Sequence, residues 1–280
     1  MKLMDEYSAL NQIKQLRKYN QVCSQLDIEL LVLHILNIDK NRLYRDNPLL
    51  TKENLKELEA LIERREKGEP IAYLTNNIGF WNLNLYVDDR VLVPRPETET
   101  LINEVLTKFD SKKRYVLDLG TGSGAIGLTL AKERPNWQVV CSDISFEALK
   151  VASKNMNLNS LKVFLVNSDW LSSFRDGQFD IIIANPPYIS TTDLRVFSDG
   201  LKFEPIGALV SELDGLKDLK KIVESSSQML VDNGYLFVEH GYDQSDMVFS
   251  FFNDFNFSCI RKYKDLNDDD RVCSGKLRRC

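Results

Sequence analysis

Residues 1–75 carry apolar side chains at helical spacing and predict a small bundle of helices. In residues 24–38, SQLDIELLVLHILNI, the apolar positions recur with the period of a helix, and Asp27 is a candidate N-cap. Thr51 is a second candidate N-cap, ahead of the periodic stretch 52–68, which is followed by a proline. The polar positions predict a solvated outer surface, so we expect a separate helical domain.

The pattern changes in residues 76–93, NNIGFWNLNLYVDDRVLV. Aromatic and β-branched residues alternate there with polar ones, and Asp88-Asp89 stands between two apolar runs. Such alternation around a polar pair predicts a β-hairpin. We expect this hairpin to connect the helical domain with residues 94–280.

Apolar strands alternate with amphipathic helices over residues 94–280, which predicts a mostly parallel sheet with helices on both faces. The expected strands are 115–120, 137–144, 162–170, 179–188 and 235–241, and the expected helices are 125–134, 146–159, 216–234 and 245–255. Two further strands, 257–266 and 271–277, are joined by a short Asp-rich link that has no room for a helix. They should therefore form an antiparallel hairpin at the edge of a seven-stranded sheet.

The composition is that of a globular protein, with 280 residues, 43% hydrophobic residues and a net charge of −5. A chain that mainly grips nucleic acid is more often basic. The five cysteines form no CxxC pair and there are two histidines, so we expect neither a metal site nor a disulfide framework. The N-terminus lacks an apolar signal core and no apolar run reaches membrane-spanning length, so we expect a cytoplasmic protein that does not bind membranes.

A glycine-rich loop, Gly120-Thr121-Gly122-Ser123-Gly124, lies between an expected strand and an expected helix. Glycine there permits a sharp turn and close approach of a ligand to the backbone, although a tight turn alone needs the same residues. Asp143 ends the next strand, about 20 residues further on, where an acid can accept hydrogen bonds from ribose hydroxyls. Asp118 could assist such binding or only brace the turn.

Asp169-Trp170 ends the third strand, and this pair suits an adenine ring. The carboxylate can accept from an adenine amino group and the indole can flank its plane, while a cap and a core residue are the alternative roles. Three consecutive strand ends thus predict an adenosine site. NAD and S-adenosylmethionine both fit, but the loop does not continue as GxGxxG because Ala125 takes the last position.

The fourth strand runs directly into Asn185-Pro186-Pro187-Tyr188. The Asn185 side-chain oxygen and the Pro186 carbonyl are two acceptors held apart by rigid residues, and they suit one planar NH2 group. Tyr188 offers a flat face for stacking. Such a frame aims the nitrogen lone pair at an electrophile, so methyl transfer from a sulfonium needs no strong base. Glu239-His240 ends the fifth strand, where a structural role and a place in the pocket both remain open.

These motifs resemble the seven-stranded, Rossmann-like S-adenosylmethionine-dependent methyltransferases that modify planar nitrogens. The stretches 64–75, RREKGEPIAYLT; 80–99, FWNLNLYVDDRVLVPRPETE; 202–210, KFEPIGALV; and 238–244, VEHGYDQ, resemble the protein-(glutamine-N5) methyltransferases of peptide release factors. The resemblance covers nearly the whole chain. It implies an α/β fold with a small N-terminal helical domain.

The resemblance also implies a reaction and its site. S-adenosyl-L-methionine would give its methyl group to the glutamine side chain in the Gly-Gly-Gln segment of class I release factors, which leaves S-adenosyl-L-homocysteine. The positions expected to contact the donor are Gly120, Thr121, Gly122, Ser123, Gly124, Asp143, Asp169, Trp170 and Asn185. The positions expected to hold the glutamine amide are Asn185, Pro186, Pro187 and Tyr188, with Asn185, Pro186 and Tyr188 catalytic. Gly127 stands where the family usually has alanine, and we expect it to cost helix stability.

Two other functions remain possible at this point. A nucleic-acid N-methyltransferase would share Asn-Pro-Pro-Tyr but needs a basic channel for an extruded base. A cofactor-fold module without catalysis is disfavoured by the intact motifs. We expect a monomer with no stable nucleic-acid binding, in which residues 1–75 and the 76–93 hairpin dock the release factor on a methyltransferase domain formed by residues 94–280.

Overall fold

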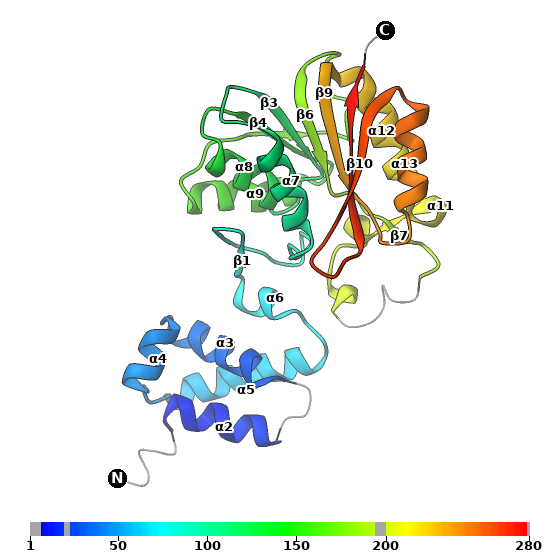
Figure 1. Ribbon diagram of the computed structural model, residues 1–280. Helices are drawn as coiled ribbons and strands as arrows, with labels where there is room; N and C mark the ends of the chain where they lie inside the picture. The colour runs from blue at the N-terminus through cyan, green and yellow to red at the C-terminus, as the bar shows by residue number, and fades with distance from the viewer. Residues whose placement is uncertain (1–6, 20–22, 194–199, 279–280) are drawn as a thin grey trace. The chain divides into compact units, whose positions relative to one another are not determined.

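The computed structural model describes residues 7–19, 23–193 and 200–278 and divides the chain into two compact units (Figure 1). The first unit is Met1–Asn77 and the second is Ile78–Cys280. The hairpin region expected as a connector therefore belongs mainly to the second unit. None of the described helices is long and apolar enough to cross a membrane.

The first unit is a bundle of helices around its own apolar core, to which Ile28, Leu31 and Leu58 contribute. Its described helices are α2 (Ala9–Tyr19), α3 (Gln25–Leu36), α4 (Lys40–Asp46), α5 (Lys52–Glu66) and α6 (Ile71–Thr75). Thr51 is the N-cap of α5, as predicted. The prediction for α3 was wrong by one turn, because Ser24 is the N-cap. In this capping box the Ser24 hydroxyl accepts from the Asp27 N–H, and the Asp27 carboxylate accepts from the Ser24 N–H.

The second unit begins with a hairpin that is shorter than predicted. Strands β1 (Ile78–Phe80) and β2 (Leu83–Leu85) turn at Trp81-Asn82, whereas Asp88-Asp89 lies in a loop beyond β2. The prediction misplaced the hairpin turn: Asp88 does begin a turn, closed by the Val91 N–H, but residues 91–93 after it form no strand. The inward-facing residues of the hairpin join the main core of this unit.

The second unit is built on a seven-stranded sheet of order β10-β11-β9-β6-β3-β4-β5, which confirms the predicted α/β fold. The strands are β3 (Tyr115–Leu119), β4 (Gln138–Asp143), β5 (Phe164–Asn167), β6 (Phe179–Ala184), β9 (Leu230–Glu239), β10 (Phe257–Lys264) and β11 (Asp270–Leu277). The five strands β9-β6-β3-β4-β5 pair in parallel. The predicted antiparallel hairpin β10–β11 is also present, and β11 pairs with β9.

Helices cover both faces of this sheet (Figure 1). Apolar residues of α7 and α8 pack in one core cluster, and those of α12 and α13 pack in the other. The helices are α7 (Thr98–Lys108), α8 (Ala125–Glu133), α9 (Phe146–Leu158), α12 (Lys217–Met229) and α13 (Ser245–Asp254).

The long helix predicted over 216–234 ends earlier than its sequence suggests. α12 stops at Met229, and the fully buried Leu230 already pairs with Phe179 at the start of β6. The backbone leaves the helix there because it gains sheet hydrogen bonds and a buried leucine. Gly234, predicted to close the helix, lies within β9.

Gly127 lies where α8 crosses the sheet, and its backbone is tightly enclosed. A Cβ at this position would lie 2.2 Å from Cys141 Sγ and 3.0 Å from Asp118 Oδ2. Close packing of α8 against Cys141 and Asp118 therefore favours glycine at this position, which helix propensity does not indicate.

We predict that Gly127→Ala lowers the free energy of unfolding, measured by urea denaturation, although alanine favours a helix by about 1 kcal/mol. Overpacking of a core typically costs about 1–3 kcal/mol and should outweigh that gain. In a Cys141→Ala background the same substitution should cost clearly less, because the sulfur is gone. A more stable Gly127→Ala protein in the wild-type background would contradict this packing.

Candidate active site

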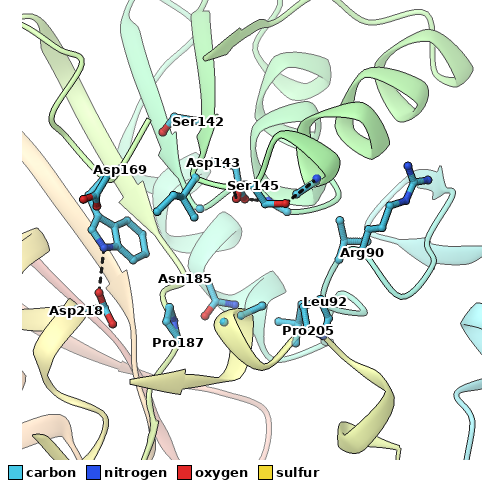
Figure 2. A pocket seen from close by; sticks show the side chains of 18 of the residues that line it. Arg90, Leu92, Ser142, Asp143, Ser145, Asp169, Asn185, Pro187, Pro205 and Asp218 are labelled. Atoms are coloured by element: carbon cyan, nitrogen blue, oxygen red, sulfur yellow. Dashed lines mark hydrogen bonds between the residues drawn. The ribbon is translucent and has the colours of Figure 1, made fainter. Parts of the chain in front are cut away.

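A cavity of about 390 Å³ opens at the carboxyl ends of the parallel strands (Figure 2). This volume lies within the range of about 300–1,000 Å³ that is usual for small-molecule and cofactor sites. Every residue that lines it belongs to the second unit. Of the predicted site residues, the lining includes Gly120, Gly122, Asp143, Asp169, Trp170, Asn185 and Pro187.

The buried carboxylate of Asp118 holds the glycine loop in place. Its Oδ2 accepts from the Thr121 hydroxyl at 2.6 Å and from the Gly127 N–H at 2.9 Å, so one oxygen ties the loop to α8. Complete burial raises the pKa of Asp118 to about 6. Asp118 therefore braces the turn, which was one of the two roles considered for it.

The other loop positions support the turn rather than line the cavity. Thr121 points to Asp118, and Gly124 precedes α8 in the left-handed conformation at φ 86°. Ser123 is buried, and its carbonyl accepts from the Asn155 side chain at 2.8 Å. The predicted donor contacts of these three residues remain predictions.

Asp143, at the end of β4, has two hydrogen bonds that shape the cavity. Its Oδ2 accepts from the Gly122 N–H and its Oδ1 from the Ser145 N–H, both at 2.9 Å. Burial raises the pKa of Asp143, and the backbone N–H groups of Ser145, Gly122 and Ile144 counteract this effect. A carboxylate has about four acceptor positions, so Asp143 can still accept a hydrogen bond from a ligand.

Trp170 is held by a partner that the sequence did not reveal. Its indole N–H donates to Asp218 Oδ1 at 3.0 Å, and Asp218 Oδ2 accepts from the Ser211 hydroxyl at 2.5 Å. The ring lies against the glycine loop, since a Cβ on Gly120 would be 3.3 Å from it. Asp169 is exposed at the rim of the cavity and forms a surface ion pair with Lys221 at 3.0 Å.

Asn185 follows β6 and is oriented by α7. Its Nδ2 donates to the Thr98 hydroxyl at 3.1 Å, and no donor among the described residues reaches its Oδ1. Pro187 lines the cavity, whereas Pro186 is buried beside it. Tyr188 is half-buried, and its hydroxyl donates to Glu239 Oε1 at 3.4 Å.

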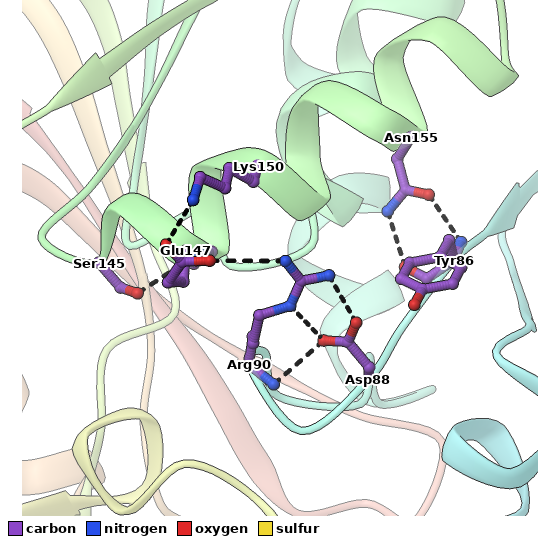
Figure 3. Close-up of polar contacts among 8 residues, drawn as sticks. Tyr86, Asp88, Arg90, Ser145, Glu147, Lys150 and Asn155 are labelled. Atoms are coloured by element: carbon purple, nitrogen blue, oxygen red, sulfur yellow. Dashed lines mark hydrogen bonds and ion pairs between the residues drawn. The ribbon is translucent and has the colours of Figure 1, made fainter.

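One wall of the cavity comes from the loop after β2, which sequence reasoning missed. Arg90 lines the cavity with its two following residues and is held by Asp88 and by Glu147 of α9 (Figure 3). Asn155 binds both backbone polar groups of Tyr86 and fixes the start of the loop. The stretch 80–99 carries part of the family resemblance and so could have indicated a functional loop. The hairpin turn predicted at Asp88-Asp89 instead assigned these residues to a strand connection.

A further part of the lining comes from residues 205–210, which include α10 (Ile206–Leu209) and the start of β8 (Val210–Ser211). The short helix η2 (Leu201–Phe203) precedes them, β7 (Ile189–Ser190) pairs with β8, and α11 (Glu212–Gly215) follows β8. The buried carboxylate of Glu204 binds Arg95 and accepts from the Val93 N–H at 3.1 Å. This contact links residues 93–95, which follow the Arg90 loop, to the residue that precedes Pro205 in the cavity lining.

Solved methyltransferases share this fold. The 16S rRNA N2 G1207 methyltransferase of T. thermophilus, solved in complex with AdoMet and guanosine, has a TM-score of 0.53 at 19% identity and covers 72% of this chain and 50% of its own. The ribosomal protein L11 methylase of Lactobacillus delbrueckii subsp. bulgaricus has a TM-score of 0.51 at 19% identity. This match covers 69% of the present chain and 84% of the methylase. The fold is therefore that of a methyltransferase.

Sequence relatives define the family. Residues 96–198 match the methyltransferase small domain and residues 9–75 match the PrmC N-terminal domain. The release factor glutamine methyltransferase of Buchnera aphidicola subsp. Schizaphis graminum is 40% identical over 89% of this chain and 91% of its own length, and that of Escherichia coli is 36% identical over the same shares. The chain belongs to the release factor glutamine methyltransferase family.

Proposed function

We propose that this enzyme transfers a methyl group from S-adenosyl-L-methionine to the side-chain N5 of the glutamine in the Gly-Gly-Gln segment of class I release factors. The observation that carries the proposal is the acceptor oxygen of Asn185, which lines the cavity and receives no hydrogen bond from the described residues, in a chain of this family. Release factor methylation would then act on translation termination.

The cavity fits an adenosine-containing donor. Asp143 retains lone pairs toward the cavity for ribose hydroxyls, and the Trp170 ring offers an apolar face. Asp169, at the rim, can accept from an adenine amino group, because an exposed ion pair such as its contact with Lys221 is weak. When bound, the donor would supply an electrophilic methyl group.

The glutamine amide would be held by Asn185 to Tyr188. Asn185 Oδ1 and the Pro186 carbonyl each accept a hydrogen bond from one of its two N–H groups, and the Tyr188 ring stacks against the plane of the amide. Both hydrogen bonds increase the electron density on nitrogen and fix the direction of its lone pair toward the cavity. After methyl transfer the nitrogen carries a positive charge and releases one of its two protons to solvent, which restores the neutral N-methyl amide.

Mass spectrometry of a class I release factor, incubated with the enzyme and S-adenosyl-L-methionine, tests the function. We expect one added methyl group on the glutamine of Gly-Gly-Gln. Asn185→Ala should lower the rate at least about tenfold, since a lost oriented acceptor costs at least about 1.4 kcal/mol. Methylation of DNA, or of another residue in the release factor, would refute the substrate assignment.

Asp143→Asn should weaken binding of S-adenosyl-L-methionine, measured by calorimetry, by about tenfold to a hundredfold. A hydrogen bond to a charged group contributes about 1.5–3 kcal/mol, and the variant loses that charge. Asp176→Asn removes an exposed carboxylate outside the cavity and serves as the matched control. Equal affinities for the two variants would contradict the role of Asp143.

The helical unit supports recognition of the whole release factor. It has its own core, supplies no residue to the cavity, and exposes the large apolar side chains of Leu26 and Leu49. One planar amide offers too little surface to select a protein substrate. In our proposal, residues 1–75 and the hairpin bind the body of the release factor while Gly-Gly-Gln enters the site.

A truncated protein that begins at Asn77 should still bind S-adenosyl-L-methionine, because the cavity lies in the second unit. It should methylate intact release factor far more slowly than the full chain does. A short Gly-Gly-Gln peptide is the matched control, and its rate should be similar with both proteins. Equal rates on the intact release factor would refute the docking role.

A further inference from the structure

The loop that follows β9 holds the end of the Asn-Pro-Pro-Tyr segment through one buried side chain. Gln244 lies in this loop directly before α13 and is 8% exposed. Its Nε2 donates to the Tyr188 carbonyl at 2.9 Å and to the Asp214 carbonyl at 3.1 Å. Its Oε1 accepts from the Gly241 N–H at 2.9 Å. The amide of Gln244 therefore joins the loop after β9 to two segments that are distant from it in sequence.

The orientation of the Gln244 amide is determined by these partners. All three are backbone groups, and a carbonyl can only accept a hydrogen bond whereas an N–H can only donate one. The NH2 end must therefore face Tyr188 and Asp214, and the oxygen must face Gly241. Each of the two N–H groups of the amide has its own carbonyl.

Gly215 packs against the same carbonyl of Tyr188. A Cβ at Gly215 would lie 2.0 Å from the Tyr188 oxygen and 2.6 Å from Gln244 Nε2. The backbone reaches this place through three consecutive left-handed residues, with φ of 54° at Leu213, 55° at Asp214 and 82° at Gly215. This conformation is unfavourable for residues that carry a side chain, so it persists only where the surroundings hold it. The hydrogen bond from Gln244 to the Asp214 carbonyl is one such contact.

The Tyr188 carbonyl is an anchor of the chain directly after the two prolines. Directly before them, the Asn185 amide is bound to the Thr98 hydroxyl at 3.1 Å. The rings of Pro186 and Pro187 fix φ at both positions, so few torsions remain free between the two anchors. A hydrogen bond that holds the Tyr188 carbonyl therefore also limits where the Pro186 carbonyl can lie.

We propose that Gln244 is a positioning residue for the acceptor glutamine, because it holds the Tyr188 carbonyl and with it the Tyr188 ring and the Pro186 carbonyl. This inference rests on the proposed function, in which that ring and that carbonyl hold the acceptor amide. Gln244 is not among the residues that line the cavity, so it acts through Tyr188.

Loss of this anchor should slow methyl transfer more than it weakens binding of the donor. The nitrogen lone pair must point at the methyl group, and a misplacement of about 1 Å can lower a rate about a hundredfold. The donor contacts proposed for Asp143 and Trp170 come from the ends of β4 and β5, and Gln244 bonds to neither residue. The affinity for S-adenosyl-L-methionine should therefore depend little on Gln244.

Gln244→Glu in the full-length enzyme removes the two donated hydrogen bonds. The carboxylate keeps the length of the side chain and can still accept from the Gly241 N–H, but it places an acceptor opposite the carbonyls of Tyr188 and Asp214. We expect kcat/KM for a Gly-Gly-Gln peptide to fall about tenfold or more. The affinity for S-adenosyl-L-methionine, measured by calorimetry, should stay within about twofold of wild type, since the proposed donor contacts are unchanged.

Ser245→Ala is the matched control. It removes another buried hydrogen bond at the start of α13, which the Ser245 hydroxyl donates to Asp270 at 2.7 Å and which does not involve Tyr188. Its kcat/KM and its donor affinity should both stay near wild type. Gly215→Ala tests the same anchor independently, because its Cβ would displace the Tyr188 carbonyl. This variant should lose kcat/KM and retain donor affinity, as Gln244→Glu does.

A wild-type kcat/KM in Gln244→Glu would overturn the positioning role. An equal loss of kcat/KM in Ser245→Ala, or a loss of donor affinity as large as the loss of kcat/KM, would overturn it as well, because either result indicates general disruption. Gly215→Ala decides the matter by the same measurements if Gln244→Glu does not fold. Failure of the proposed function is distinguishable, because wild-type enzyme would then leave the glutamine of the peptide unmethylated.

Discussion

The parallel pairing of β3 with β4 and β6, and of β6 with β9, is the constraint on which the whole site depends. It brings four strand ends to one edge, and each end supplies a different polar group. Asp118 and the glycine loop come from β3, Asp143 from β4, Asn185 from β6 and Glu239 from β9. Side chains distant in sequence thus become neighbours without any long loop, because the sheet hydrogen bonds fix their spacing.

Three of these groups are carboxyls that the fold shields from solvent, Asp118 and Glu239 almost completely and Asp143 in part. Asp118 uses one oxygen to bind both a hydroxyl and a backbone N–H. Asp143 accepts two backbone N–H groups and remains open to the cavity. Glu239 accepts from the Tyr188 hydroxyl, and its Oε2, like Oδ1 of Asp118, has no hydrogen-bond partner among the described residues. The site is therefore organised by hydrogen-bond donors that the fold supplies before any ligand arrives.

The strands and most helices could be predicted because apolar runs and helical periodicity are local signals. The carboxyl ends of the strands, and with them Asp143, Trp170 and Asn185, followed from the same signals. The contacts of Trp170 with Asp218 and of Asn155 with Tyr86 could not be predicted, since they join residues far apart in the chain. The end of α12 was missed for a related reason: its last turn competes with sheet pairing, which a local pattern does not record.

The position of β11 has a consequence for how the protein acquires its structure during synthesis. β11 follows β10 in the chain, yet it lies between β10 and β9 and pairs with Glu239 through Val272. Until β11 has left the ribosome, the edge of β9 therefore lacks its neighbour and exposes unpaired backbone groups. The glycine loop and β3 to β6 precede β11 in the chain and can form earlier. The part of the site proposed to bind the methyl donor can therefore fold during synthesis, whereas the surroundings of Glu239 are complete only after β11 pairs with β9.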